Sequence, residues 1–149
     1  GIQALDLLGR KVVMEGGRGL TLLATRINDT IMRAMHEPAL ADHAQSLARA
    51  LQRVGAATKA AWSTGNPTEA LANATPYLQA FGHTVLAWIW LDVVLALPAA
   101  GDNRHAPFIE GKLAAMRYFF HYELPKIDAW LGVVSSRDMT CASVSLEAF

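Results

Sequence analysis

The sequence predicts an all-α protein: an up-down-up-down four-helix bundle, preceded by a short helical stub and followed by a weakly structured C-terminal tail. Apolar residues recur at intervals of three and four along four long segments, and turns rich in proline and glycine separate them. No segment shows the alternation typical of a strand. Short connections favour antiparallel neighbours, so we expect the stub at residues 1–16, the bundle at 17–134 and the tail at 135–149.

Composition narrows the classes of protein that are possible. The 149 residues are enough for one domain with a sizeable core, and 13 basic and 13 acidic side chains cancel, which argues against a nucleic-acid or anionic-membrane partner. One cysteine, Cys141, excludes an internal disulfide framework and fits a reducing cytoplasm, and no signal peptide is recognisable. The apolar run Thr84 to Ala100 contains Asp92 and ends at Pro98, and its uncharged part is shorter than the roughly 20 residues of a membrane span. We therefore expect a cytoplasmic protein without a membrane span.

The chain starts without a methionine, inside what the pattern predicts to be a helix, so we expect a cut end. Apolar residues stand there at helical intervals: Ile2, Leu5, Leu7, Leu8 and Val12. The Gly16-Gly17 pair should end this stub or bend it into the next helix, because glycine tolerates a left-handed position.

Two helices should follow the stub. The first runs from about Arg18 to Met35 and stops before Pro38, because the residue before a proline avoids the helical region. Its expected inward residues are Leu20, Leu23, Ala24, Ile27 and Ile31. The next runs from about Ala39 to Ser63. Its expected inward residues are Leu40, Ala44, Leu47, Leu51, Val54, Ala57 and Thr58, with Arg49, Gln52, Arg53 and Lys59 on another face.

The stretch from Asn66 to Leu97 should be the centre of the bundle. Asn66 can act as N-cap, Pro67 fits the first helical position and Glu69 stands where a capping box places a carboxylate. The expected inward stripe is Leu71, Thr75, Leu78, Phe81, Gly82, Val85 and Ile89. Beyond Thr84 almost every residue is apolar, so we expect neighbours on all sides of that half. At Pro76 either Thr75 caps a second helix or the helix kinks.

A loop from Pro98 to Pro107 should turn the chain into the last helix, about Pro107 to Val134, with a second kink at Pro125. The expected inward residues are Phe108, Leu113, Met116, Phe119, Phe120, Leu124, Ile127 and Leu131. The tail has no sustained period and should be extended or partly disordered, although Leu146 and Phe149 could dock on the bundle.

The residues alone do not assemble a catalytic or metal-binding motif. A di-metal bundle needs Glu-x-x-His pairs, and no glutamate here is followed by histidine at that spacing. The histidines at 36, 43, 83, 105 and 121 are interpreted as surface or core residues, the four tryptophans as core or interface residues, and Cys141 lacks an adjacent base. Asp92 interrupts the apolar run; it pairs with Lys112 or Arg117, or it is a functional acid in a pocket.

A family resemblance adds to this interpretation. Residues 1–11, Gly-Ile-Gln-Ala-Leu-Asp-Leu-Leu-Gly-Arg-Lys, resemble the stretch after the catalytic Tyr-Glu-Gly-Thr motif of bacterial FAD-dependent acyl-CoA dehydrogenases. The subgroup it resembles includes the 3-methylmercaptopropionyl-CoA dehydrogenases and has an additional C-terminal helical domain. The rest of the chain is similar to that domain in outline, through Pro76-Tyr77-Leu78, Phe81-Gly82, Arg117-Tyr118-Phe119, Leu124-Pro125 and the ending Leu146-Glu147-Ala148-Phe149.

The resemblance implies an oxidoreductase that removes the α and β hydrogens of an acyl-CoA thioester. In that family a glutamate takes the α proton and FAD accepts a hydride from the β carbon. The glutamate would precede Gly1, so the resemblance implies no catalytic residue and no metal ligand in this chain, with only Gly1 and Gln3 bordering the cofactor. It implies a C-terminal fragment, inactive alone, whose partners are the rest of the dehydrogenase chain and further copies in a homo-oligomer.

The alternative is a freestanding helical-bundle module that binds a protein partner through an exposed apolar surface and has no enzymatic activity. The codons before Gly1 distinguish the two hypotheses. A Tyr-Glu-Gly-Thr motif there supports the dehydrogenase, whereas a nearby start codon supports the module.

Overall fold

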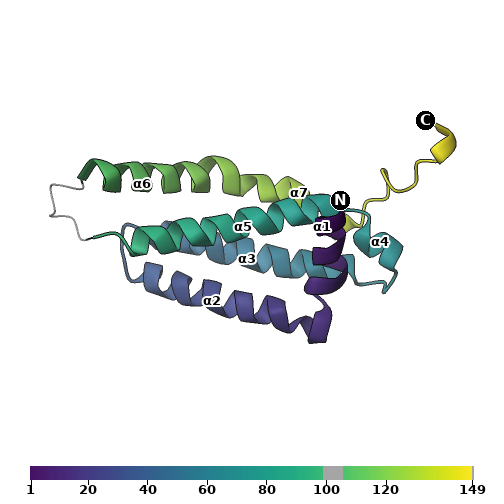
Figure 1. Cartoon of the computed structure of the whole chain (residues 1–149), viewed down its shortest axis with the longest axis horizontal. Coiled ribbons are helices and arrows are strands. Elements are labelled where there is room, and N and C mark those ends of the chain that lie inside the picture. Colours follow the sequence, from purple (N-terminus) through teal and green to yellow (C-terminus); the bar gives the residue numbers. More distant parts are fainter. Residues whose placement is uncertain (99–105, 149) are drawn as a thin grey trace.

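The computed structural model describes residues 1–98 and 106–148, and all regular structure within them is helical, which confirms the all-α prediction. Four rods lie side by side, and each runs opposite to the one before it in the chain (Figure 1). They are α2 (Arg18–Met35), α3 (Ala41–Ala61), α5 (Ala74–Leu95) and a fourth rod that begins with α6 (Ala106–Tyr118) and ends with α7 (Ile127–Ser136).

The stub is α1 (Ile2–Asp6), a π-helical turn (Leu7–Lys11) and a 3-10 turn (Met14–Gly17), and it crosses the end of the bundle at the start of α5 (Figure 1). Ala4, Leu8 and Val12 are buried in the common core. The chain bends into α2 at Gly16 and Gly17, whose φ angles are 65° and 84°, so the predicted glycine bend is confirmed.

Helices α2 and α3 match their predicted ranges to within two residues. The buried residues of α2 lie in its second half, at Ile27, Thr30, Ile31 and Ala34, while the expected Leu20, Leu23 and Ala24 are only half-buried. In α3 the expected face is buried except for Leu51, which is half-buried.

The central stretch begins as predicted. The side chain of Asn66 accepts a hydrogen bond from the Thr68 amide at 3.0 Å, and Pro67 opens α4 (Pro67–Leu71). Glu69 accepts from Thr64 Oγ1 at 2.8 Å, which braces this start. The helix then breaks and α5 begins at Ala74, so neither a cap at Thr75 nor a kink at Pro76 occurs. Pro76 lies in the first turn of α5, where amides need no helical partner.

The register of α5 differs from the expected stripe. The face that packs against α2, α3 and α7 consists of Ala74, Tyr77, Ala80, Thr84, Ala87, Leu91 and Val94. Four of these are alanine or threonine, because small side chains let neighbouring helices approach closely. The expected inward residues Thr75 and Ile89 are exposed instead.

The expectation that the second half of α5 is covered on all sides is also wrong. Leu86 and Ile89 are each 46% exposed and Val93 is 37% exposed. These three residues follow the i, i+3, i+7 spacing of one face, and we call them the α5 stripe. Helix α5 has the length and the apolar composition of a membrane-spanning helix, but the core helix of a helical bundle can have both as well.

The fourth rod is interrupted near Pro125, as predicted. Between α6 and α7 the backbone widens into a π turn (Phe119–Glu123) and tightens into a 3-10 turn (Leu124–Lys126). The expected inward residue Phe108 is 58% exposed, because it lies in the first turn of α6 and contacts the ammonium of Lys112.

The start of the tail is fixed to the bundle. Arg137 donates to the carbonyl oxygen of Ala60 at 3.2 Å and to Ser63 Oγ at 2.9 Å, and Asn73 donates to the carbonyl of Asp138 at 2.8 Å. Farther on the tail leads away from the rods (Figure 1). Most of the predicted loop from Pro98 to Pro107 and the proposed docking of Leu146 and Phe149 lie outside what the structure describes.

Candidate functional site

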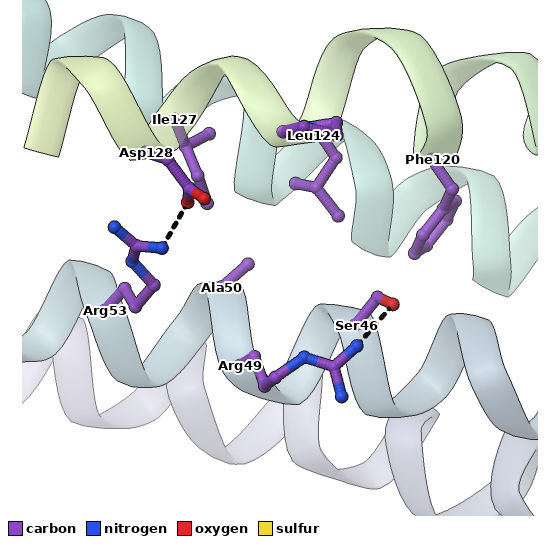
Figure 2. Close-up of a pocket in the computed structure, with 9 residues that line it drawn as sticks. Ser46, Arg49, Ala50, Arg53, Phe120, Leu124, Ile127 and Asp128 are labelled. Atoms are coloured by element: carbon purple, nitrogen blue, oxygen red, sulfur yellow. Dashed lines mark hydrogen bonds and ion pairs between the residues drawn. The ribbon is translucent and has the colours of Figure 1, made fainter.

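A groove between α3 and the bend of the fourth rod is the candidate site, with a cavity volume of about 250 Å³ (Figure 2). It opens where Pro125 interrupts the rod, because proline has no amide hydrogen to continue the α-helical pattern. π turns are frequent at functional sites. The groove is lined by Ser46, Arg49, Ala50, Arg53, Phe120, Leu124, Pro125, Ile127 and Asp128.

The floor of this groove is apolar and buried. Ala50 of α3 and Phe120, Leu124 and Ile127 of the fourth rod are each at most 7% exposed, and they belong to the common core. In Figure 2 the side chains of Leu124 and Ile127 point from the fourth rod toward α3. A ligand in the groove would therefore meet hydrocarbon on its inner side.

The rim of the groove carries two guanidinium groups. Arg49 and Arg53 are one helical turn apart on α3, and both are exposed. Arg53 forms an ion pair with Asp128 across the groove, whereas Arg49 donates to Ser46 Oγ at 2.9 Å (Figure 2). Within the described residues Arg49 has no acidic partner at ion-pair distance. The sequence placed both arginines on a polar face, but the groove depends on a bend in another helix.

A pair of histidines adjoins the groove through Phe120. The ring of His43 lies edge-on to Phe120, with 5.1 Å between centroids, and to His121, with 6.1 Å. Nδ1 of His43 is enclosed and has no hydrogen-bond partner in the described part of the chain. Burial, then the charges of His121 and Arg117, lower the pKa of His43, while Asp42 opposes this shift.

Asp92 belongs to a polar cluster between α5 and α2. It pairs with Arg33 at 2.6 Å and accepts from Thr30 Oγ1 at 3.3 Å. The predicted partners Lys112 and Arg117 are wrong, because Asp92 faces α2 and not the fourth rod. Its side chain is 49% exposed and paired with Arg33, and it lines an open cavity with Thr30 and Trp88, so its role as a functional acid stays a prediction.

The remaining candidates are dispersed. His83 contacts Trp130 and Phe119, and its Nε2 lies 3.4 Å from Glu123 Oε2. The hydrogen bond from Lys126 first, then those with His83 and Tyr118, lower the pKa of Glu123, while desolvation opposes this shift. His105 lies outside the described residues, and in the described ranges no three His, Cys, Asp or Glu side chains are close enough to hold a metal ion.

Gly1 and Gln3, the residues predicted to border a flavin, lie at the start of the stub. Both are exposed, and Gln3 is on α1. Within this chain they lie on an open surface, and their place beside a flavin stays a prediction. Cys141 is exposed in the tail.

Comparison with known proteins identifies the class of domain. A family model described as acetyl-CoA dehydrogenase C-terminal like matches residues 23–145. A butyryl-CoA dehydrogenase of Syntrophomonas wolfei is 28% identical over 155 aligned residues, which cover 99% of this chain and 25% of that protein. A 3-methylmercaptopropionyl-CoA dehydrogenase of Ruegeria pomeroyi is 31% identical over 132 residues, which cover 86% of this chain and 22% of that protein.

The helical architecture and the match together define a C-terminal helical domain. The chain belongs to the acyl-CoA dehydrogenase family, as the resemblance of its sequence implied. It spans about a quarter of the length of the curated relatives that it matches.

Proposed function

We propose that the chain is the C-terminal helical domain of a longer FAD-dependent acyl-CoA dehydrogenase, which oxidises the α,β bond of an acyl-CoA thioester in the cytoplasm. The observation that carries this proposal is the family match over residues 23–145, together with relatives about four times as long. The names of both relatives specify acyl-CoA dehydrogenation, which supports the acyl-CoA class of substrate.

In this proposal the domain has a structural or oligomerisation role and is inactive alone. The α5 stripe supports that role, because Leu86, Ile89 and Val93 form an apolar face on the most central helix that the described part of this chain covers only in part. Exposed apolar faces of this kind are typical of contacts with other protein surfaces. The rest of the dehydrogenase, or a second copy, would cover the stripe.

The stub supports the same arrangement. Gly1 lies beside the start of α5, because α1 packs on that helix (Figure 1). Polypeptide that precedes Gly1 in a longer protein would therefore enter next to α5. Gly1 and Gln3 would then form one edge of a flavin site whose other walls come from that preceding part.

The test compares two proteins. One is this 149-residue chain, and the other is the longer product of the same gene, which includes the codons upstream of Gly1. We expect the longer protein to carry FAD and to show bleaching of its flavin absorption when an acyl-CoA is added without oxygen. The 149-residue chain should be colourless and inactive.

Two results would contradict the proposal. One is a longer protein that never binds flavin. The other is a start codon just upstream of Gly1 with a stable homo-oligomer of the chain in light scattering, which supports the freestanding interaction module instead.

A further inference from the structure

We infer that the groove between α3 and the bend of the fourth rod is a binding site for a linear aliphatic monocarboxylate. The carboxylate would lie on the guanidinium groups of Arg49 and Arg53, and the alkyl chain would lie on the floor formed by Leu124 and Ile127. This site is separate from Gly1 and Gln3 and does not depend on the proposed function.

The head group follows from the charges on the rim. Arg49 uses one of its terminal nitrogens on Ser46 and has no acidic partner among the described residues, so most of its five N–H donors are free for a ligand. Guanidinium groups bind carboxylates through paired hydrogen bonds, which are roughly twice as strong as neutral ones.

Asp128 limits the charge of the expected ligand to a single negative charge. This carboxylate pairs with Arg53, so the groove has one net positive charge among its lining side chains. A second negative charge on the ligand would lie near Asp128 and be repelled. The groove therefore suits a carboxylate better than a phosphate dianion.

The apolar floor of the groove is the reason to expect an alkyl chain in the ligand. Leu124 and Ile127 line the cavity of about 250 Å³ and are only 5% and 3% exposed, so its inner wall is packed hydrocarbon with few polar partners. Binding pockets for small ligands combine such apolar walls with a few polar groups that fix orientation. Each methylene that the floor removes from water strengthens binding by up to about fourfold.

The experiment titrates the ¹⁵N-labelled chain with sodium hexanoate and follows amide shifts by NMR. We expect saturable shifts confined to residues 46–53 and 120–128. The R49Q variant should bind hexanoate roughly tenfold more weakly, since it loses a charge-assisted pair. The matched control is K59Q, which removes one positive charge from the same helix outside the groove and should bind like the wild type.

Three probes test the two halves of the ligand. Acetate should bind more weakly than hexanoate, 1-hexanol should cause no saturable shifts in the groove, and inorganic phosphate should bind more weakly than hexanoate. The inference is overturned if R49Q and K59Q bind equally, if acetate matches hexanoate, or if phosphate binds more tightly. Well-dispersed spectra of both variants show that a loss of binding is not a loss of fold.

Discussion

The indole Nε1 of Trp88 donates a hydrogen bond to Oγ1 of Thr30, 2.8 Å away, and this contact joins α5 to α2. Arg33 donates to the same oxygen at 3.2 Å, and Thr30 is 2% exposed. The buried hydroxyl of Thr30 is therefore the common partner of the polar side chains between these two helices. The nearby Asp92 carboxylate, which is hydrogen-bonded to Arg33, raises the pKa of Arg33.

Replacing Thr30 by valine should destabilise the protein by about 1–3 kcal/mol, because the Trp88 N–H loses its acceptor while the side-chain shape is kept. Urea unfolding measures this change. The matched control is Thr25→Val on the exposed side of α2, where the hydroxyl bonds only to the Thr21 carbonyl within the described chain. Equal effects of the two substitutions would show that the contact with Trp88 is unimportant.

The stub should behave as part of the core and not as a loose extension. Leu8 is 0% exposed, and its carbonyl accepts a hydrogen bond from Trp62 Nε1 at 3.1 Å. Leu8→Ala should cost about 2–5 kcal/mol of unfolding free energy. Ile2→Ala, at a residue that is 83% exposed, should change it by less than about 0.5 kcal/mol. A small effect at Leu8 would mean that the stub unfolds separately.

Tyr77 makes stability sensitive to alkaline pH. Burial raises its pKa to about 12, although the hydrogen bond with Thr58 at 2.7 Å opposes this shift. Because the folded-state pKa lies above the ordinary value of 10.0, the unfolded chain loses the proton first and stability falls as pH rises from about 10 toward 12.

Tyr77→Phe should remove this alkaline loss and should cost about 1 kcal/mol at pH 8, where the hydrogen bond is intact. Unfolding curves at pH 8 and about pH 11 provide the comparison. Tyr122→Phe is the control at a site that is 67% exposed and should keep the stability at pH 8. An unchanged alkaline profile in Tyr77→Phe would contradict this assignment.

His43 should make the protein less stable in acid. Its pKa is lowered in the fold, so the unfolded chain binds the proton more readily, and stability falls as pH decreases from about the ordinary value of 6.5. The difference in unfolding free energy between pH 8 and pH 5.5 should be smaller in His43→Gln than in the wild type. An equal difference would assign the acid effect to other groups.

The sequence predicted features that depend on neighbouring residues in the chain. The start at Asn66 and Pro67 and the bend at Gly16-Gly17 were found where expected, because caps and glycine conformations are local. The interruption at Pro125 was also expected, since the missing amide acts within one turn.

Features that depend on distant residues were not predicted. Helix α5 is apolar on nearly every side, so its pattern did not show that Tyr77, Ala80 and Ala87 face the core while Ile89 does not. The partner of Asp92 is Arg33, 59 residues away, and no local pattern favoured it over Lys112. The groove required the bend at Pro125 to meet the arginines of α3, which only the packed structure shows.

Carbene footprinting, measured by mass spectrometry on peptides that contain Leu86, Ile89 and Val93, tests directly whether another protein surface covers the α5 stripe. We expect strong labelling of these residues in the 149-residue chain and much weaker labelling in the proposed longer protein, because the rest of that protein or a second copy would cover them. Equally strong labelling in both proteins would contradict this expectation.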